Sequence, residues 1–266
     1  MARTPKPSTA PKPKPLGKPA AARMSLTDAM SALEKAGSAQ TRKTYARHGA
    51  KEPMFGVSFA DLKTLMKRIK VDQELALALW NTGNFDARNL AVKIVDPRLM
   101  SAKELDQWAS EDTAPMCHGY VAQLAAEGPH GRSRAEAWLA SKSELRRCIG
   151  WLLVGALAMR DEEVPTNWFA SRIATIEKTI HAAPNHEREA MNKAIISIGG
   201  RDATARKAAL TAAKRIGTVT VDHGDTACKT PDAAAYIEKT WAHATAKGFE
   251  SPAAQERNRE SMRTRC

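Results

Sequence analysis

A run of twelve residues with no charged or polar side chain, 148–159, most constrains the fold of this chain. A helix that is apolar on every face must be buried, because no face is left for water. The run is too short to cross a bilayer, which needs about 20 residues. Ser141 and Glu144 precede it at the spacing of a capping box, the reciprocal pairing found at helix starts. We therefore expect a buried central helix over residues 141–160.

The first turn of this expected helix carries Arg146 and Arg147. Cations at the positive end of a helix dipole are unfavourable by roughly a few tenths of a kcal/mol each, so they need compensation. One interpretation is solvation or pairing with a glutamate. The other is an anion, such as a phosphate, held at the helix start. Both interpretations stay open at this point.

Helical signals recur along most of the chain. Ser25 with Asp28, Ser58 with Asp61, and Ser101 with Glu104 repeat the capping pattern of a helix start. Apolar residues then follow helical spacing, most clearly at positions 87, 90, 91, 94 and 95. Residues 219–221 are a weak strand candidate, and residues 55–59 are better read as a turn. The sequence therefore predicts an all-α protein.

Three segments share a faint internal pattern of a capping residue, an acid and an arginine at the start of a helix. They are residues 84–88, 143–147 and 185–188. Helix pairs that recur in this way are typical of an α-solenoid of the HEAT type, although coincidence among helix starts is an alternative. If the pairs stack in register, Arg88, Arg147 and Arg188 should line one edge of a concave basic face. Guanidinium groups beside helix N-termini would suit phosphates.

The charge of the chain favours a polyanionic partner. The 266 residues are 43% hydrophobic, enough for a sizeable core, and carry a formal net charge of +12. Residues 1–23 hold six Lys or Arg, no acid and alternating Lys and Pro, so we expect a disordered basic tail that is either dispensable or a tether to nucleic acid. Residues 24–246 are expected to form the solenoid. Residues 247–266 are expected to form a flexible basic tail.

The cysteines give no sign of a metal centre. Cys117, Cys148, Cys228 and Cys266 are scattered, without a CxxC pair. No secretory signal is evident, so a reducing cytoplasm is expected, with nucleoid association if the source is bacterial. Asp222, His223, Asp225 and Cys228 crowd into a short stretch of residues 216–232. That stretch fits no standard zinc or calcium loop; we favour a hydrogen-bonded turn over a metal site.

Several blocks resemble the AlkD-like DNA alkylation-repair family, whose members are alkylpurine DNA glycosylase-like. The blocks are residues 45–49, 56–63, 79–88, 190–195 and 221–231, and the resemblance covers about 25–245. It implies a curved stack of HEAT-like pairs that cradles double-stranded DNA. Some members release N3- or N7-alkylated purines without metal or cofactor and without inserting the base into a pocket. It also implies a carboxylate beside the deoxyribose, aromatic contacts and an arginine on the phosphate.

The chain departs from the family at the implied catalytic stretch, which matches residues 113–118. On that pairing Ala114 replaces a Trp and His118 replaces the catalytic Asp, while a second family Trp falls near Ser197. An imidazole cannot supply the fixed negative charge that an oxocarbenium-like centre needs. Glu111 or Asp112 could substitute for the carboxylate. The phosphate-gripping arginine matches Arg147.

Three hypotheses follow from these observations. The first is a DNA-binding solenoid with doubtful glycosylase activity, binding double-stranded DNA as a monomer without metal, cofactor or membrane. The second is an active alkylpurine glycosylase that uses Asp112 or Glu111. The third is a protein-binding HEAT scaffold. The expected nucleic-acid-binding residues are cations: Arg42, Lys43, Arg47, Lys67, Arg68, Arg88, Arg146, Arg147, Arg188 and Lys193.

Overall fold

The structure is a computed structural model that describes residues 23–111 and 113–265. Residues 1–22, most of the expected basic tail, lie outside this part. Within it all regular structure is helical, with an isolated bridge between Gly37 and Val57, which confirms the predicted all-α class. The elements are α1 (Leu26–Ala36), α2 (Ala39–Arg47), α3 (Phe59–Ile69), α4 (Gln73–Asn81), α5 (Phe85–Ile94), η1 (Pro97–Leu99), α6 (Ala102–Trp108), α7 (Pro115–Glu127), α8 (Gly131–Leu139), α9 (Glu144–Arg160), α10 (Thr166–Thr179), η2 (Ile180–Ala182), α11 (Asn185–Gly199), α12 (Ala203–Ile216), α13 (Ala233–Ala246) and α14 (Pro252–Arg257).

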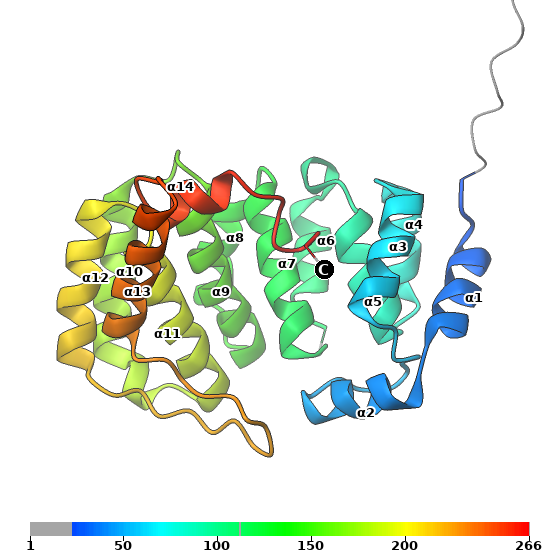
Figure 1. Cartoon of the computed structure of the whole chain (residues 1–266), viewed down its shortest axis with the longest axis horizontal. Coiled ribbons are helices and arrows are strands. Elements are labelled where there is room, and N and C mark those ends of the chain that lie inside the picture. Colours follow the sequence, from blue (N-terminus) through cyan, green and yellow to red (C-terminus); the bar gives the residue numbers. More distant parts are fainter. Residues whose placement is uncertain (1–22, 112, 266) are drawn as a thin grey trace, which may run out of the picture.

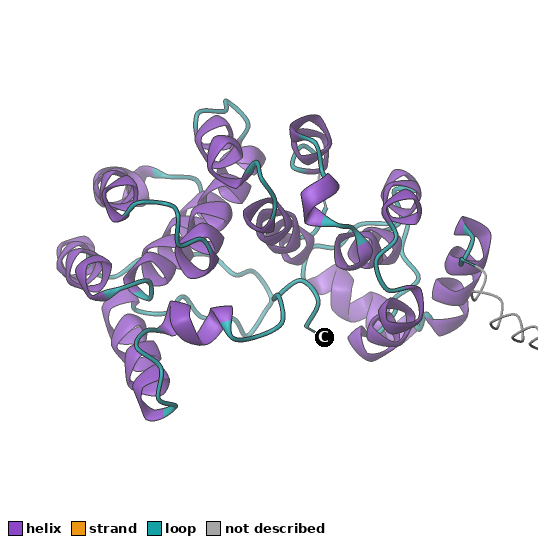
Figure 2. Cartoon of the chain, turned by 90° about the horizontal axis from the view of Figure 1, so that it is seen from above, coloured by secondary structure: helices purple, strands orange, loops and turns teal. Residues whose placement is uncertain are grey.

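From α4 onward the helices stack as antiparallel pairs in two layers. Helices α5, α7, α9 and α11 form the inner layer, and each packs on the next along the chain. Helices α4, α6, α8, α10 and α12 lie outside them, and the whole stack curves into an arc (Figure 1, Figure 2). Because one outer helix separates each inner helix from the next, all inner helices run in the same direction. Their N-termini therefore share one edge of the stack.

Helix α9 is the predicted central helix, and it packs against α7, α8 and α11. Nine of its residues are buried, as the apolar run required. Leu152, Ala156 and Met159 are half-buried, because this face lines a hollow on the inner side of the arc. The predicted cap at Ser141 is wrong: the helix is capped by Ser143, whose hydroxyl accepts a hydrogen bond from Arg146 N.

The predicted helix starts at Ser25, Ser58 and Ser101 are confirmed, whereas the predicted cap at Asn185 is wrong: Pro184 is the N-cap of α11, and Asn185 Nδ2 donates to Asp222 O at 2.8 Å. Ser25 and Ser58 cap α1 and α3. Ser101 and Glu104 form a complete capping box at the start of α6, with both reciprocal hydrogen bonds. Each such cap satisfies backbone amides that the helix itself leaves without partners. The positions at which these helices begin were therefore readable from short-range chemistry.

Buried polar side chains fix segments that carry no regular structure. The Asp86 carboxylate is fully buried and accepts hydrogen bonds from the backbone amides of Phe55, Gly56 and Val57 at 2.6, 3.0 and 2.8 Å. Arg201, which is 8% exposed, donates to the carbonyls of Asp161 and Val164 after the end of α9, both at 2.6 Å. These contacts hold neighbouring helix pairs in register.

The last residues do not form the flexible tail that the sequence predicted. Ser251 caps α14, and Ala253 N donates to Gly200 O at 3.0 Å. The chain then crosses the inner face of the arc (Figure 2), and Arg263 is buried at its far end. We call residues 252–265 the C-terminal strap. Its anchors are long-range partners, which explains why a polar composition misled the prediction.

Residues 217–232 form a long loop between α12 and α13 rather than a strand. Hydrogen bonds within it are those of turns: Gly224 N donates to Asp222, and His223 pairs with Thr230 at 2.9 Å. In residues 23–111 and 113–265, no three His, Cys, Asp or Glu side chains gather in an arrangement that could hold a metal ion. A search of the same residues for a helix with the length and apolarity needed to span a membrane found none.

Candidate nucleic-acid interface

The three arginine-bearing helix starts lie at one edge of the stack, which we call the N-terminal edge and define as the edge where α5, α7, α9 and α11 begin. Phe85 N donates to Pro53 O at 2.9 Å, and Gly49 lies against Pro115 at the start of α7. Helix α2 flanks one end of this edge, and the 217–232 loop flanks the other (Figure 1).

Arg147 points to a carboxylate of the protein itself. Its Nε lies 3.0 Å from Glu187 Oε2 and its Nη2 lies 2.9 Å from the same atom, and Nη1 donates to the carbonyls of Ser141 and Lys142. Trp151 Nε1 also donates to Glu187 at 3.4 Å. The hydrogen bond to Glu187 raises the pKa of Arg147. The glutamate interpretation of this helix start is therefore the one that the geometry fits.

Arg88 and Arg188 are also held by the protein. Arg88 pairs with Glu111, donates to Trp80 O at 3.3 Å, and lies 5.2 Å from the centre of the Trp80 ring. Arg188 donates to the carbonyls of Thr220 and Ala183, both at 2.9 Å. The three arginines thus lie along one edge, and each uses its donors to tie that edge to adjoining segments.

The remaining predicted cations divide into three groups, on α2, on α3 and on the inner helices. Lys43 and Arg47 are exposed on α2, a helix without an acidic residue, and Arg42 beside them pairs with Glu52 at 2.6 Å. Lys67 and Arg68 lie in the last turn of α3, at the opposite edge. That edge is where α5 ends, since Asp72 N of the α3–α4 connection donates to Ile94 O.

The other two predicted cations lie on the inner helices α9 and α11. Arg146 Nη2 donates to Asp106 O at 3.2 Å, across to the end of α6. Lys193 pairs with Glu189 at 2.6 Å, keeps a side chain that is 54% exposed, and reaches the inner face.

The stretch that the resemblance pairs with the family's catalytic residues opens α7. Ala114 and His118, which the resemblance pairs with the family Trp and the catalytic Asp, are both buried there. Burial raises the pKa of the neighbouring Cys117 thiol to about 12, which leaves it without nucleophilic thiolate at neutral pH. Glu111 is engaged with Arg88. Asp112 lies outside the described residues.

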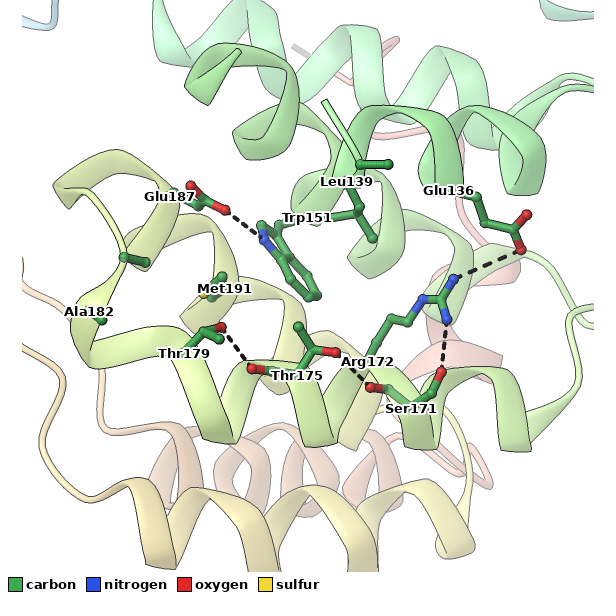
Figure 3. Close-up of a pocket in the computed structure, with 12 residues that line it drawn as sticks. Glu136, Leu139, Trp151, Ser171, Arg172, Thr175, Thr179, Ala182, Glu187 and Met191 are labelled. Carbon is green, nitrogen blue, oxygen red and sulfur yellow. Dashed lines mark hydrogen bonds and ion pairs between the residues drawn. The ribbon is translucent and has the colours of Figure 1, made fainter. Parts of the chain in front are cut away.

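Two hollows in the described part of the chain are each lined by more than one inner helix. The larger, about 930 Å³, lies between α7, α9, α11, α13 and the C-terminal strap on the inner face. The smaller, about 550 Å³, lies between the outer helices α8 and α10, and the buried Trp151 ring forms its floor (Figure 3). At one end of it Glu187 accepts from Trp151, and at the other Arg172 lies 3.9 Å from Glu136 (Figure 3).

Sequence reasoning missed the residues that shape these surfaces. In the sequence, Glu187 is only one acid of a repeated helix start. In the structure its side chain is 7% exposed and pairs with Arg147. The sequence placed Arg263 in a flexible tail. In the structure it donates to Glu127 and to Val92 O, both at 2.7 Å. Short-range sequence signals cannot reveal partners that lie so far apart in the chain.

The fold defines a class of helical-repeat protein. Antiparallel helix pairs stack side by side, and the inner helices all begin at one edge. The sequence matches the family described as DNA alkylation repair enzyme over residues 29–237, most of the chain. The chain belongs to this family.

Similar proteins agree with this placement. Uncharacterized proteins of Listeria monocytogenes and Listeria innocua are 28% and 27% identical over 205 residues, covering 75% of this chain and 89% of each relative. A solved structure, described as a new family of proteins related to the HEAT-like repeat DNA glycosylases with affinity for branched DNA structures, superposes with a TM-score of 0.75. It is 30% identical and covers 86% of this chain and 98% of its own. The predicted HEAT-like solenoid is confirmed.

Proposed function

We propose that this protein binds DNA along its N-terminal edge and the adjoining inner face, without efficient alkylpurine glycosylase activity. The observation that supports this proposal is the row of exposed cations along the N-terminal edge. Lys43 and Arg47 lie on α2 at one end of the edge, and Lys142 and Lys229 follow toward the other end. Helices α7 and α11 begin at this edge without a side-chain cap. Apart from Pro115, which has no N–H, the residues of their first turns carry amides that suit phosphate oxygens.

In this proposal the arginines at the helix starts contribute to DNA binding indirectly. Arg88, Arg147 and Arg188 hold the edge in shape, and the lysines supply the charge that meets phosphates. DNA affinity of this kind comes largely from release of counterions and depends steeply on salt. The branched-DNA affinity named for the similar solved structure supports including a four-way junction among the substrates to be tested.

The proposal against catalysis rests on the start of α7. Release of an alkylated base needs a fixed negative charge where the sugar becomes cationic. His118 stands where the resemblance places that charge, and the Glu111 carboxylate pairs with Arg88. Incubation with methylated DNA and measurement of free 3-methyladenine and 7-methylguanine tests this part. Release in excess of a single turnover would overturn it and favour the Asp112 alternative.

Binding is tested by fluorescence anisotropy with a duplex and a four-way junction over a range of salt. The variant Lys43→Ala/Arg47→Ala should weaken binding of both and lower the salt slope by about 0.9 for each lost phosphate contact. The matched control is Lys207→Ala/Lys214→Ala, which removes equal charge from exposed positions of the outer helix α12. Equal losses in the two variants would contradict the proposed edge. Absence of any DNA binding at low salt would favour the protein-scaffold hypothesis.

A further inference from the structure

The larger hollow is a feature that an open, DNA-binding arc of helices does not need. Small residues let the elements around it approach closely: a Cβ added at Gly155 of α9 would lie 3.2 Å from Ser197 of α11, and one added at Gly200 would lie 3.2 Å from Pro252 of the C-terminal strap. The strap supplies one wall of a space of about 930 Å³ through Pro252, Glu256, Met262 and Arg265. That volume lies within the range of small-molecule sites, roughly 300–1,000 Å³.

The lining combines an apolar floor with polar groups at its margins. Leu152, Ala156 and Ile196 belong to the floor, and Tyr120 and Tyr236 add aromatic rings from α7 and α13. Aromatic faces favour stacking with a nucleobase, worth roughly 1–3 kcal/mol per base. This composition, mostly apolar with a few polar groups, is typical of sites for planar ligands.

Positive charge lies beside this floor. Lys193 and Lys229 both line the hollow, and Lys229 is exposed on the loop that flanks the N-terminal edge. Gln123, 4% exposed, also lines it, and its amide nitrogen has no hydrogen-bond partner within residues 23–111 and 113–265. Buried polar groups in proteins are nearly always paired, so this unpaired amide marks a polar point in the wall of the hollow.

We propose that the hollow binds one nucleotide, with its base over the apolar floor and its phosphate beside Lys193 and Lys229. The ligand has two possible sources, a free mononucleotide or a nucleotide extruded from bound DNA. For the second source the inference rests on the proposed DNA-binding function. For the first source it does not.

The test uses the full chain with two probes. Isothermal titration with deoxyadenosine monophosphate measures the free nucleotide. A four-way junction carrying 2-aminopurine at the branch measures extrusion, because this base becomes fluorescent when it leaves the stack. Wild type should bind the mononucleotide with millimolar affinity or better. If DNA is the source, the fluorescence should rise on binding.

Ala156→Phe fills the hollow from its floor, and Ala170→Phe places the same ring on an exposed position of α10 as the matched control. The filling variant should weaken nucleotide binding at least about tenfold and remove the fluorescence rise, while the control keeps both. Equal behaviour of the two variants would overturn the proposal. So would a wild type that binds neither the mononucleotide nor an extruded base.

Lys229→Gln provides a second variant that cannot disturb the core, since the side chain is exposed. It should weaken deoxyadenosine monophosphate without changing binding of deoxyadenosine, which lacks the phosphate. Equal binding of the monophosphate by wild type and variant would contradict the phosphate placement. If wild type binds DNA by anisotropy but gives neither nucleotide signal, the nucleotide site is refuted and the proposed DNA binding stands. If wild type binds the mononucleotide but no DNA, the proposed DNA binding is refuted and the nucleotide site stands.

Discussion

Arg147 and Glu187 join the first turns of α9 and α11 through Nε and Nη2 of the guanidinium, which lie 3.0 and 2.9 Å from one carboxylate oxygen. The Glu187 side chain is nearly buried, whereas the Arg147 side chain keeps a quarter of its surface exposed. The unfavourable placement of a cation at a helix N-terminus is thereby offset from the neighbouring repeat. This pairing makes Arg147 a clamp between repeats.

Glu187→Gln tests the clamp, because it keeps the shape of the side chain and removes its charge. Arg147 would then be a half-buried cation without its carboxylate, and we expect a loss of about 1–3 kcal/mol in the free energy of unfolding. Urea denaturation measures it. Glu189→Gln is the control: its partner is the exposed Lys193, so its cost should stay within about 0.5 kcal/mol. Similar costs for both variants would show that the clamp adds little.

Asp86→Asn should destabilise the connection before α3. The buried carboxylate accepts three backbone amides, and an amide side chain presents only one acceptor oxygen. We expect a loss of about 2–4 kcal/mol and faster hydrogen exchange at Phe55, Gly56 and Val57. Unchanged exchange at these amides would contradict the role assigned to Asp86. Asp61→Asn, at an exposed position in the first turn of α3, is the control.

Arg263→Ala should release the end of the C-terminal strap. The substitution removes the donors to Glu127 and to Val92 O and leaves the glutamate without its cation. We expect a loss of about 2–4 kcal/mol and rapid proteolytic cleavage after residue 257. Arg259→Ala, at an exposed position of the same segment, should leave the cleavage pattern of wild type. Protection of the strap in both variants would mean that other contacts hold it.

Thiol labelling should separate the cysteines. Burial raises the pKa of both Cys117 and Cys148 to about 12, so at pH 8 these thiols are protonated as well as shielded. Cys228 is exposed and should react with iodoacetamide within minutes. Mass spectrometry of the native protein should find Cys117 and Cys148 unmodified until denaturant is added. Early modification of either would contradict their burial.

Acid stability should depend in part on Arg98. Its side chain donates to Asp96 and lowers the pKa of that carboxyl to about 2. Because the folded pKa lies below the unfolded value, this pair stabilises the fold above about pH 4. The contribution is lost as the pH falls from there toward 2. Arg98→Gln should therefore flatten this part of the acid unfolding curve followed by circular dichroism, whereas Arg132→Gln, at an exposed position of α8, should not.

The sequence predicted the helices well because their signals are local. A serine and the acid three residues after it determine where α1, α3 and α6 begin. The apolar run of α9 required burial, and that burial is found. At Ser141 the same pattern misled, because two serines compete there and the carbonyls of residues 141 and 142 bind Arg147 instead.

The candidate site was less predictable, because its residues find their partners across the fold. The sequence left open whether Arg147 meets an anion or a glutamate, and only the packing of α11 on α9 decides between them. The strap misled for the same reason: Glu127 and Arg263 are far apart in sequence, and no local pattern relates them. Charge patterns indicated a polyanion partner but not which cations would be exposed.

The anchoring of Arg263 on α5 and α7 also bears on how the molecule unfolds. In a repeat protein each unit contacts only its neighbours, so the ends can unravel separately and stability is close to a sum of local terms. Here the last segment of the chain grips Val92 and Glu127, near the middle of the stack. The C-terminal helices therefore cannot unfold without breaking the contacts of Arg263 with the central helices α5 and α7. We expect calorimetry to record a single cooperative transition rather than gradual fraying.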